Sequence, residues 1–273
     1  QGQVFKGSGY EFPVISRAES PKSPRLSDME AFYQKYYVAN NMALILCGKF
    51  NEKDVLPLLE KTFGRIHNGP IPQRQPINLA DFSPEKTIKV KIPFPLIKVS
   101  ALLFRGPTPR NHDYTALQIA MRLLSNSNES GLIDSLVSHH SIMYGMAASE
   151  QISMMREVGL IGLAAVPNLP FGSKRKAERL LWQQINKLKE GDFSTESFEA
   201  AKTEYQKMQE QQLENLQTRI TLMTNCYLNG MNWNDYLHQI SMLTTLQKDD
   251  VVAACRHYFN QHYLLLHKKF GKY

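Results

Sequence analysis

The sequence has few cysteines, and their placement excludes two common kinds of structural site. Only three occur in 273 residues, at Cys47, Cys226 and Cys255, and no two have CxxC spacing. A disulfide framework or a structural zinc site needs pairs of cysteines at short, regular spacing. Each of the three stands among apolar residues, so we expect buried free thiols.

Long apolar runs are also lacking. The longest candidates are short segments such as 42–47, far below the roughly 18 residues that a membrane-spanning helix needs. We therefore expect no membrane span. The composition, 42% hydrophobic and 21% charged, is typical of a globular chain rather than a disordered one.

Self-contained catalytic motifs are missing as well. Neither HxxEH nor HExxH occurs, so no segment offers two histidines and a glutamate on one helical face for a zinc ion and its water. A GxSxG elbow and a phosphate-binding GxxxxGK loop are equally lacking. His139 and His140 are adjacent, without a carboxylate beside them in the sequence. We predict no catalytic residue and no metal ligand in this chain.

The net charge of +7 arises from 32 Lys and Arg against 25 Asp and Glu. These charges are spread along the chain, with short basic clusters only at 174–176 and 268–269. Binding to a nucleic-acid backbone needs basic residues gathered on one face. We therefore expect a solvated surface and no nucleic-acid partner.

Residues 27–66 predict a helix, a strand and a second helix. Ser27 and Glu30 have the spacing of a capping box, and apolar residues follow at helical spacing. Residues 42–47 form a short, continuous apolar run, which is typical of a buried strand. A second helix is expected over 52–63, between a capping asparagine and a terminating glycine.

Residues 68–86 contain four prolines and no apolar periodicity, so they predict an extended linker. The part before it, 1–67, is short for an independent hydrophobic core. We expect this first part to be only a portion of a domain, and 87–273 to form the larger domain.

The larger part alternates between paired strand candidates and runs of helices. The strand candidates are 87–92, 96–104, 142–153, 158–166 and 263–267. Helical periodicity covers 114–124, 132–137, 172–189, 195–217 and 220–228, with two shorter helices before Phe259. Because adjacent strand pairs are followed by groups of helices, we predict an α+β fold with helices on one face of an antiparallel sheet.

The segments 28–50 and 250–273 resemble each other at an offset of 222 residues. The identical pairs are Asp28 with Asp250, Ala31 with Ala253, Tyr36 with Tyr258 and Leu44 with Leu266. One further residue of offset places Gly48-Lys49-Phe50 on Gly271-Lys272-Tyr273. A repeat of this length predicts a duplicated domain, in which 27–50 superposes on 250–273.

Two passages resemble one known family. FYQKYYVANNMAL followed by CGKF, within 32–50, resembles the FYxxYYxxNNMxL…Gxf passage of the insulinase-like (pitrilysin-type, inverzincin) zinc metallopeptidases. KTFG at 61–64 resembles the end of their domains, and SGLIDSLV at 130–137, followed by IMY at 142–144, resembles their SRLxxxLRxxxxLxY passage. The resemblance covers essentially the whole chain and is strongest over 27–66.

The resemblance implies homologous α+β domains, with the HxxEH metal site in the first part of an active domain, which would precede Gln1. It thus implies that 1–67 is the C-terminal part of a first peptidase-like domain, that 68–86 is a linker, and that 87–273 is a second, homologous domain without metal. The last helix of that domain could lie beyond the chain. We expect no cofactor in this chain, zinc in the parent protein, and the rest of the parent chain or a paired half as a partner.

The resemblance further implies a non-catalytic portion of a zinc metalloendopeptidase that helps to enclose and bind peptides or unfolded proteins. The chain alone would be inactive. An inactive peptidase-like scaffold, or partner-binding subunit, is the alternative. Family members whose second domain contacts substrate use an Arg-Tyr pair, but Gly131 and Val137 stand where arginines are expected. Tyr144 is then the one substrate-binding candidate, with a packing role in the sheet as its alternative.

Overall fold

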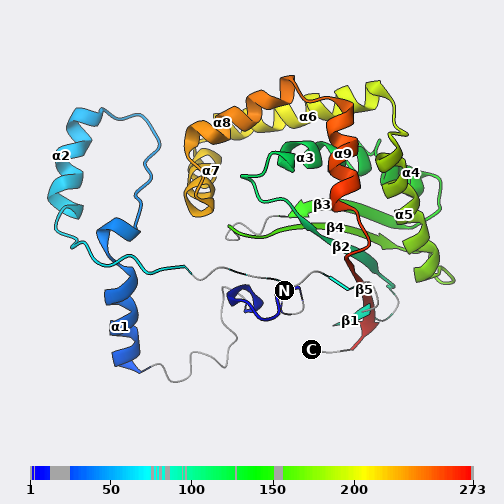
Figure 1. The fold of residues 1–273 in the computed structure, drawn as a ribbon, viewed down its shortest axis with the longest axis horizontal. Coiled ribbons are helices and arrows are strands. Elements are labelled where there is room, and N and C mark those ends of the chain that lie inside the picture. The colour runs from blue at the N-terminus through cyan, green and yellow to red at the C-terminus, as the bar shows by residue number, and fades with distance from the viewer. Residues whose placement is uncertain are drawn as a thin grey trace. The chain divides into compact units, whose positions relative to one another are not determined.

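The computed structural model divides into two compact units. It describes residues 2, 4–12, 25–74, 77, 79, 82, 83, 87–93, 95, 97–126, 128–150 and 156–271. Unit 1 comprises residues 1–79 and 213–227, and unit 2 comprises residues 80–212 and 228–273. Unit 2 contains the β-sheet that Figure 1 shows.

Unit 2 is built on a mixed β-sheet. Among the described residues its strands are β1 (Thr87–Ile92), β2 (Ser100–Gly106), β3 (Tyr144–Glu150), β4 (Gly159–Val166) and β5 (Tyr263–Phe270). Their order across the sheet is β1-β5-β2-β4-β3. The pairs β5-β2, β2-β4 and β4-β3 are antiparallel, whereas β1 and β5 are parallel. No short hairpin joins β1 to β5, which are far apart in the sequence, so their direction is not forced to alternate.

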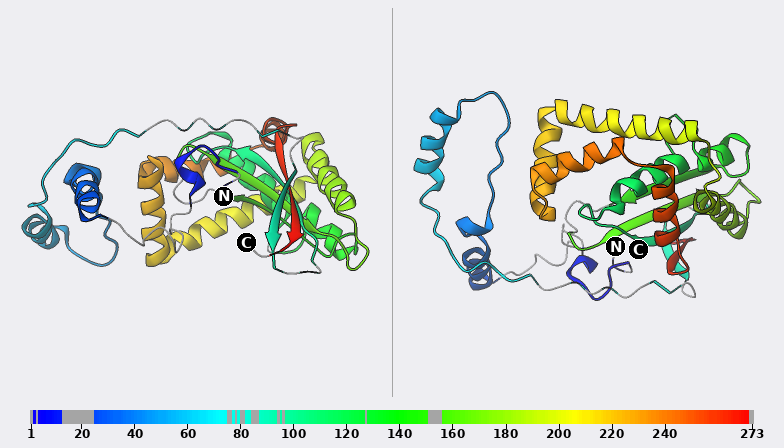
Figure 2. Two further views of the ribbon diagram at one scale, coloured as in Figure 1. Left: turned by 90° about the horizontal axis from the view of Figure 1, so that it is seen from below. Right: turned by 45° about the horizontal axis from the view of Figure 1, so that its top comes forward.

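Helices cover one face of this sheet, as predicted. They are α3 (Asp113–Leu124), α4 (Leu132–Ser138), α5 (Lys174–Glu190), α6 (Thr195–Glu214), α8 (Trp233–Ser241) and α9 (Lys248–Tyr258), with a short 3-10 turn, η4 (Met242–Thr244), between the last two. The helices α3, α4, α5 and α9 contact the strands directly and lie over the same face (Figures 1 and 2). The α+β class predicted from the sequence is confirmed, and the parallel β1-β5 pair is its one departure from an antiparallel sheet.

Element boundaries differ modestly from those predicted. β2 begins at Ser100 rather than at 96, and the predicted strand end at 153 lies outside the described residues. The helix predicted over 195–217 ends at Glu214, and α7 (Leu216–Asn229), which has residues in both units, begins directly after it. The break is at Asn215, whose Oδ1 accepts hydrogen bonds from the backbone N and the Oγ1 of Thr218. This side chain caps a new helix, so the break that periodicity predicts after residue 217 lies earlier in the chain.

A cluster of aromatic rings holds the sheet to its helices. Phe104 of β2 is completely buried, and its ring centroid lies 5.7 Å from that of Trp182 on α5 and 5.1 Å from that of Phe259, which follows α9. Tyr263 of β5 contacts both Phe104 and Trp182. Edge-to-face contacts of this kind favour one relative placement of the elements that carry the rings. Two strands and two helices therefore meet at Phe104.

Unit 1 contains α1 (Leu26–Tyr36), α2 (Glu52–Phe63) and two 3-10 turns, η1 (Gly9–Glu11) and η3 (Ala39–Asn41). The predicted second helix is confirmed: Asn51 accepts a hydrogen bond from the backbone N of Lys53 at 3.1 Å, and Gly64 follows its last residue. The predicted capping box at Ser27 is wrong. α1 already begins at Leu26, so Ser27 lies inside the helix, and the N-cap residue Arg25 makes no side-chain cap.

The strand predicted over 42–47 is also wrong for this structure. This segment follows η3 and belongs to neither a helix nor a strand. A strand needs a neighbouring strand to hydrogen-bond with, and no described residues provide one for this segment. Met42, Leu44 and Leu46 remain exposed as a result. An apolar run thus favours a strand, but the strand forms only where another strand is available to pair with it.

The helical part of the predicted internal repeat is present. α1 and α9 have the same length, and both their first and last residues differ by 222 in number. Each helix ends in the same turn: φ and ψ are −95° and 60° at Tyr37, and −88° and 67° at Phe259. The strand that follows α9, β5, has no counterpart after α1. The two segments therefore agree in their helices and differ in their strands.

The two equivalent helices differ sharply in burial. α9 buries four residues against the core of unit 2, whereas α1 buries none. Phe32 and Tyr33 of α1 are 58% and 59% exposed, yet they correspond to Ala254 and Cys255, which are both buried. The apolar face of α1 thus has the pattern of a core-facing helix without the core that α9 covers.

We expect Phe104→Ala to lower the free energy of unfolding by about 3–5 kcal/mol, because it removes the ring that joins two strands to two helices. Chemical denaturation followed by circular dichroism measures this change. Phe171→Ala is the matched control, since its ring is 94% exposed and the substitution should leave stability nearly unchanged. Equal effects of the two substitutions would contradict the central role of Phe104.

Candidate functional site

The face of the sheet that the helices leave open has an apolar depression. Its volume is about 190 Å³, and its lining includes Leu103 of β2, Met146 of β3, and Leu160 and Gly162 of β4. The depression exists because small residues occupy its centre: Gly162 stands opposite Leu103 on one side and Ala148 on the other. Larger apolar side chains surround this centre, so the surface fits an apolar group.

The strand beside the depression, β3, is the edge of the sheet. Within the described residues it pairs with β4 on one side, and no strand pairs with its other side. An edge strand presents backbone N–H and C=O groups along its outer side, where another extended chain can add as a further strand. The open face therefore combines an apolar depression with a backbone template beside it.

Tyr144, the predicted substrate contact, is the first residue of β3. Its side chain is 56% exposed, and its hydroxyl makes no hydrogen bond to another described residue. The next residue, Gly145, faces the helices, because a Cβ there would lie 2.4 Å from Cγ2 of Ile133. By alternation, Tyr144 and Met146 point to the open face. Tyr144 thus lies outside the core, and its contact with substrate stays a prediction.

The structure gives physical reasons for the two missing arginines. Gly131 is the N-cap of α4, and a Cβ at this position would lie 2.4 Å from the carbonyl oxygen of Leu124 and 2.7 Å from Oδ2 of Asp134. No longer side chain fits this turn without moving the backbone. Val137 is half-buried and packs against the core of unit 2. Neither position offers a charged group to a ligand.

The donor set that a zinc ion requires is not assembled in the described part of the chain. No three His, Cys, Asp or Glu side chains there lie close enough to hold a metal ion. The ring of His139 contacts the carbonyl oxygen of Ser135, and the ring of His267 contacts Glu178. The described residues therefore do not fit a zinc site.

The cysteines are free, as predicted, but they are not equally buried. Cys226 and Cys255 are buried, whereas Cys47 is partly exposed. Burial raises the pKa of Cys255 to about 12. The thiolate is the reactive form of cysteine, so Cys255 is unreactive at neutral pH.

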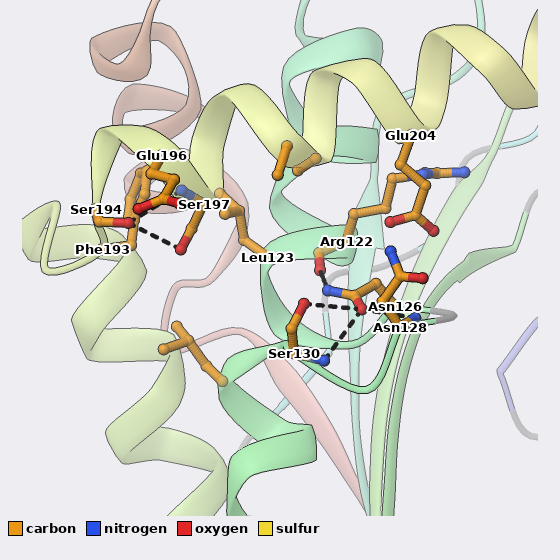
Figure 3. Close-up of a pocket in the computed structure, with 13 residues that line it drawn as sticks. Arg122, Leu123, Asn126, Asn128, Ser130, Phe193, Ser194, Glu196, Ser197 and Glu204 are labelled. Atoms are coloured by element: carbon orange, nitrogen blue, oxygen red, sulfur yellow. Dashed lines mark hydrogen bonds between the residues drawn. The ribbon is translucent and has the colours of Figure 1, made fainter.

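A second pocket lies between α3, the loop that follows it and α6 (Figure 3). Its volume is about 390 Å³, and its polar lining includes Arg122, Asn126, Ser130, Glu196 and Glu204. This set offers hydrogen-bonding groups of both charges, but it lacks a nucleophile activated by a base. The pocket therefore supports binding rather than catalysis.

Arg122 forms one wall of this pocket. Its guanidinium lies 4.3 Å from the ring centroid of Tyr205, a cation–π contact, and donates a hydrogen bond to the carbonyl oxygen of Gln118. Burial lowers the pKa of Arg122, although the Coulombic interactions with Tyr205 and Glu204 oppose that shift. Burial also raises the pKa of Tyr205. The guanidinium of arginine is not deprotonated in proteins, so Arg122 gives this wall a positive charge.

The loop beside the pocket is built by two side chains. Oδ1 of Asn126 accepts hydrogen bonds from the backbone N of Asn128 and from the backbone N and Oγ of Ser130 (Figure 3). The carboxylate of Asp134 accepts bonds from the Oγ of Ser125 and from the backbone N of Asn126 and Gly131. Asparagine and serine in this run signal a turn. No pattern in the sequence indicates this pocket, because Arg122 and Glu204 are 82 residues apart.

The sequence model described as the peptidase M16 inactive domain matches residues 25–205. The chain belongs to the peptidase M16 family. The insulinase-like resemblance found in the sequence is thereby confirmed. The matched part is a non-catalytic, peptidase-like half of the M16 type. No helix among the described residues is long and apolar enough to cross a membrane.

Three solved structures show the same fold. A protease from Helicobacter pylori is 18% identical, with a TM-score of 0.81 over 95% of this chain and 62% of that chain. A peptidase M16 inactive domain from Pseudomonas fluorescens is 14% identical, with a TM-score of 0.78 over 99% of this chain and 63% of that chain. A chain of complex III2 from Candida albicans is 15% identical, with a TM-score of 0.79 over 98% of this chain and 64% of that chain. A comparison with curated proteins gives no match.

This M16 chain spans less than two thirds of each of those three chains. Identities of 14–18% show a shared fold and nothing more specific.

We expect Asp134→Ala to lower the free energy of unfolding by roughly 1–3 kcal/mol, because it removes the acceptor for two backbone N–H groups and one hydroxyl. Thermal unfolding followed by circular dichroism measures the loss. Asp192→Ala is the control, since that carboxylate is exposed and bonds to no described residue. A stable Asp134→Ala variant would show that the loop does not depend on this side chain.

Proposed function

We propose that this chain is the non-catalytic portion of an insulinase-like zinc metalloendopeptidase and helps to enclose and bind extended peptides or unfolded proteins. The observation that carries this proposal is the open sheet face, where an apolar depression adjoins the free edge of β3. An extended peptide needs both features, since its backbone requires hydrogen-bonding partners and its alternate side chains require pockets.

In the proposed complex the peptide adds to the outer edge of β3 as a further strand. Its side chains then alternate between the two faces of the enlarged sheet. Side chains on the open face are directed toward Met146 and the centre formed by Gly162. Tyr144, at the start of the same strand, is available to donate its hydroxyl proton to a peptide carbonyl. An extended peptide with bulky apolar side chains at alternate positions is the substrate that this surface fits.

We further propose that 1–67 and 87–273 belong to two homologous domains joined by the linker 68–86. The shared length and shared final turn of α1 and α9 support this division. The exposed apolar face of α1 supports the proposal that the rest of the first domain is needed to cover it. We propose that the zinc ion and its ligands belong to the rest of the parent chain or to a paired half, because the described residues of this chain do not assemble them.

The alternative function is an inactive scaffold or partner-binding subunit. The fold likeness to a chain of complex III2 from Candida albicans favours it, because that chain is part of an assembly. A scaffold needs neither a free β3 edge nor an open apolar depression. Peptide binding at this face therefore separates the two functions.

We expect Gly162→Val to weaken peptide binding roughly tenfold or more, because its side chain fills the depression that receives an apolar group. Fluorescence anisotropy of a labelled, unstructured peptide with leucine at alternate positions measures the affinity. Circular dichroism shows whether the variant is folded, since a Cβ at 162 would lie 3.0 Å from Cδ2 of Leu103.

Phe171→Ala is the control for the same experiment. Its ring is almost fully exposed and outside the depression, so the substitution tests nonspecific apolar attraction. Affinity should be unchanged in this variant. If the unsubstituted chain binds no peptide, or if Gly162→Val binds it normally, the scaffold function is favoured instead.

We expect Tyr144→Phe to weaken binding of the same peptide about three- to tenfold, the usual effect of losing one hydrogen bond. The ring remains, so stability should not change. Tyr33→Phe, which removes a similarly exposed hydroxyl in unit 1, is the control. Equal affinities of the Tyr144→Phe variant and the unsubstituted chain would exclude Tyr144 as a substrate contact.

A further inference from the structure

A polar groove lies along the outer edge of β3. Its volume is about 390 Å³, and its lining includes Gln118 and Arg122 of α3, Glu204 of α6, and Ala147 and Ala148 of β3. Consecutive strand residues point to opposite faces of a sheet, so a cavity that touches both alanines contacts the strand from its side. None of the described lining residues belongs to β4. The groove therefore lies at the edge of β3 that has no described neighbouring strand.

The edge of β3 lies between this groove and the apolar depression of the open face. Ala148 lines both cavities, and its neighbour Ala147 packs against the core on the helix side. A strand that adds to this edge alternates its side chains as β3 does, because residues directly opposite each other share a face. The residue opposite Ala147 is then directed toward the groove. The residues before and after it are directed toward the open face.

The groove continues into the pocket between α3 and α6. Arg122, Asn126 and Glu204 line both cavities (Figure 3). The pocket also has a volume of about 390 Å³. A side chain that enters the groove at Ala147 can therefore be long, because the space extends beyond the groove between the two helices.

The charges along this path favour a cationic side chain. Glu204 lines both cavities and Glu196 lines the pocket, whereas Arg122 is the one basic residue in either described lining. The guanidinium of Arg122 lies over the ring of Tyr205 at 4.3 Å and donates to the carbonyl oxygen of Gln118 at 3.1 Å. These contacts hold the guanidinium against the protein. An amine that enters the groove gains carboxylate acceptors, whereas a carboxylate would be repelled by two glutamates.

We propose that this groove selects peptides that place a lysine or arginine opposite Ala147, between apolar residues on the open face. This selection rests on the proposed addition of a peptide to the edge of β3. It defines the substrate class as an extended segment in which basic and bulky apolar side chains alternate. Glu204 determines the specificity, because it lines both the groove at β3 and the pocket beyond it.

The test compares three labelled, unstructured peptides that contain the pattern Leu-X-Leu-X-Leu, in which X is lysine, methionine or glutamate. Fluorescence anisotropy at one ionic strength measures their affinities. The lysine peptide should bind about tenfold more tightly than the methionine peptide, as expected for one charge-assisted hydrogen bond. The glutamate peptide should bind most weakly. The chain has a net charge of +7, so diffuse attraction would favour the glutamate peptide instead.

Glu204→Gln should remove the preference for lysine and leave the affinity of the methionine peptide unchanged, because the amide keeps the shape of the side chain without its charge. Glu210→Gln is the matched control on the same helix. Glu210 is exposed, lines neither cavity and accepts a hydrogen bond from Gln206, which an amide oxygen can also accept. Circular dichroism shows whether both variants are folded.

The outcomes distinguish failure of this selectivity from failure of peptide binding itself. If none of the three peptides binds the unsubstituted chain, both proposals are overturned. If all three bind equally and Gly162→Val weakens each of them, the proposed function stands and the selectivity is overturned. A preference for the glutamate peptide also overturns the selectivity. A lysine preference that survives in Glu204→Gln, or that Glu210→Gln removes to the same extent, does so as well.

Discussion

The difference between the two faces of the β2-β4-β3 sheet is the constraint on which the rest of unit 2 depends. Large side chains such as Phe104, Ile161 and Leu163 point to the helices and are completely buried. Glycine and alanine occupy much of the opposite face around the apolar depression. The helices pack on the side that carries the larger apolar side chains, and the other side remains open. The alternation of side chains between the two faces of these strands thus produces both the core and the candidate binding surface.

The same physical requirement explains why unit 1 differs from unit 2. α1 and α9 are equivalent in length and final turn, yet only α9 covers a sheet. Aromatic residues such as Phe32 and Tyr33 fold into a helix through local hydrogen bonds, but their burial needs a second layer. Local sequence is sufficient for the helix, whereas the strand predicted over 42–47 requires neighbouring strands to form. This is why the helix prediction is confirmed and the strand prediction is wrong.

Charge shows a similar dependence on the tertiary structure. In the sequence, Lys98, Lys174 and Lys268 are separated by more than seventy residues each and suggest a diffuse surface. The fold brings the segment before β2, the start of α5 and the end of β5 together, and each of the three amines donates to a backbone carbonyl of another of these segments. Arg122 and Glu204 line one pocket for the same reason. A property that depends on distance cannot be inferred from spacing along the chain.

The sequence by itself determined the family, the α+β class, most helices and strands, and Tyr144 as a candidate contact. These follow from periodicity and short motifs, which act over neighbouring residues. Only the tertiary structure decided the parallel β1-β5 pair, the open face beside β3 and the exposure of α1. Each of these depends on which distant segments come into contact, because burial and electrostatic interaction act through space rather than along the chain.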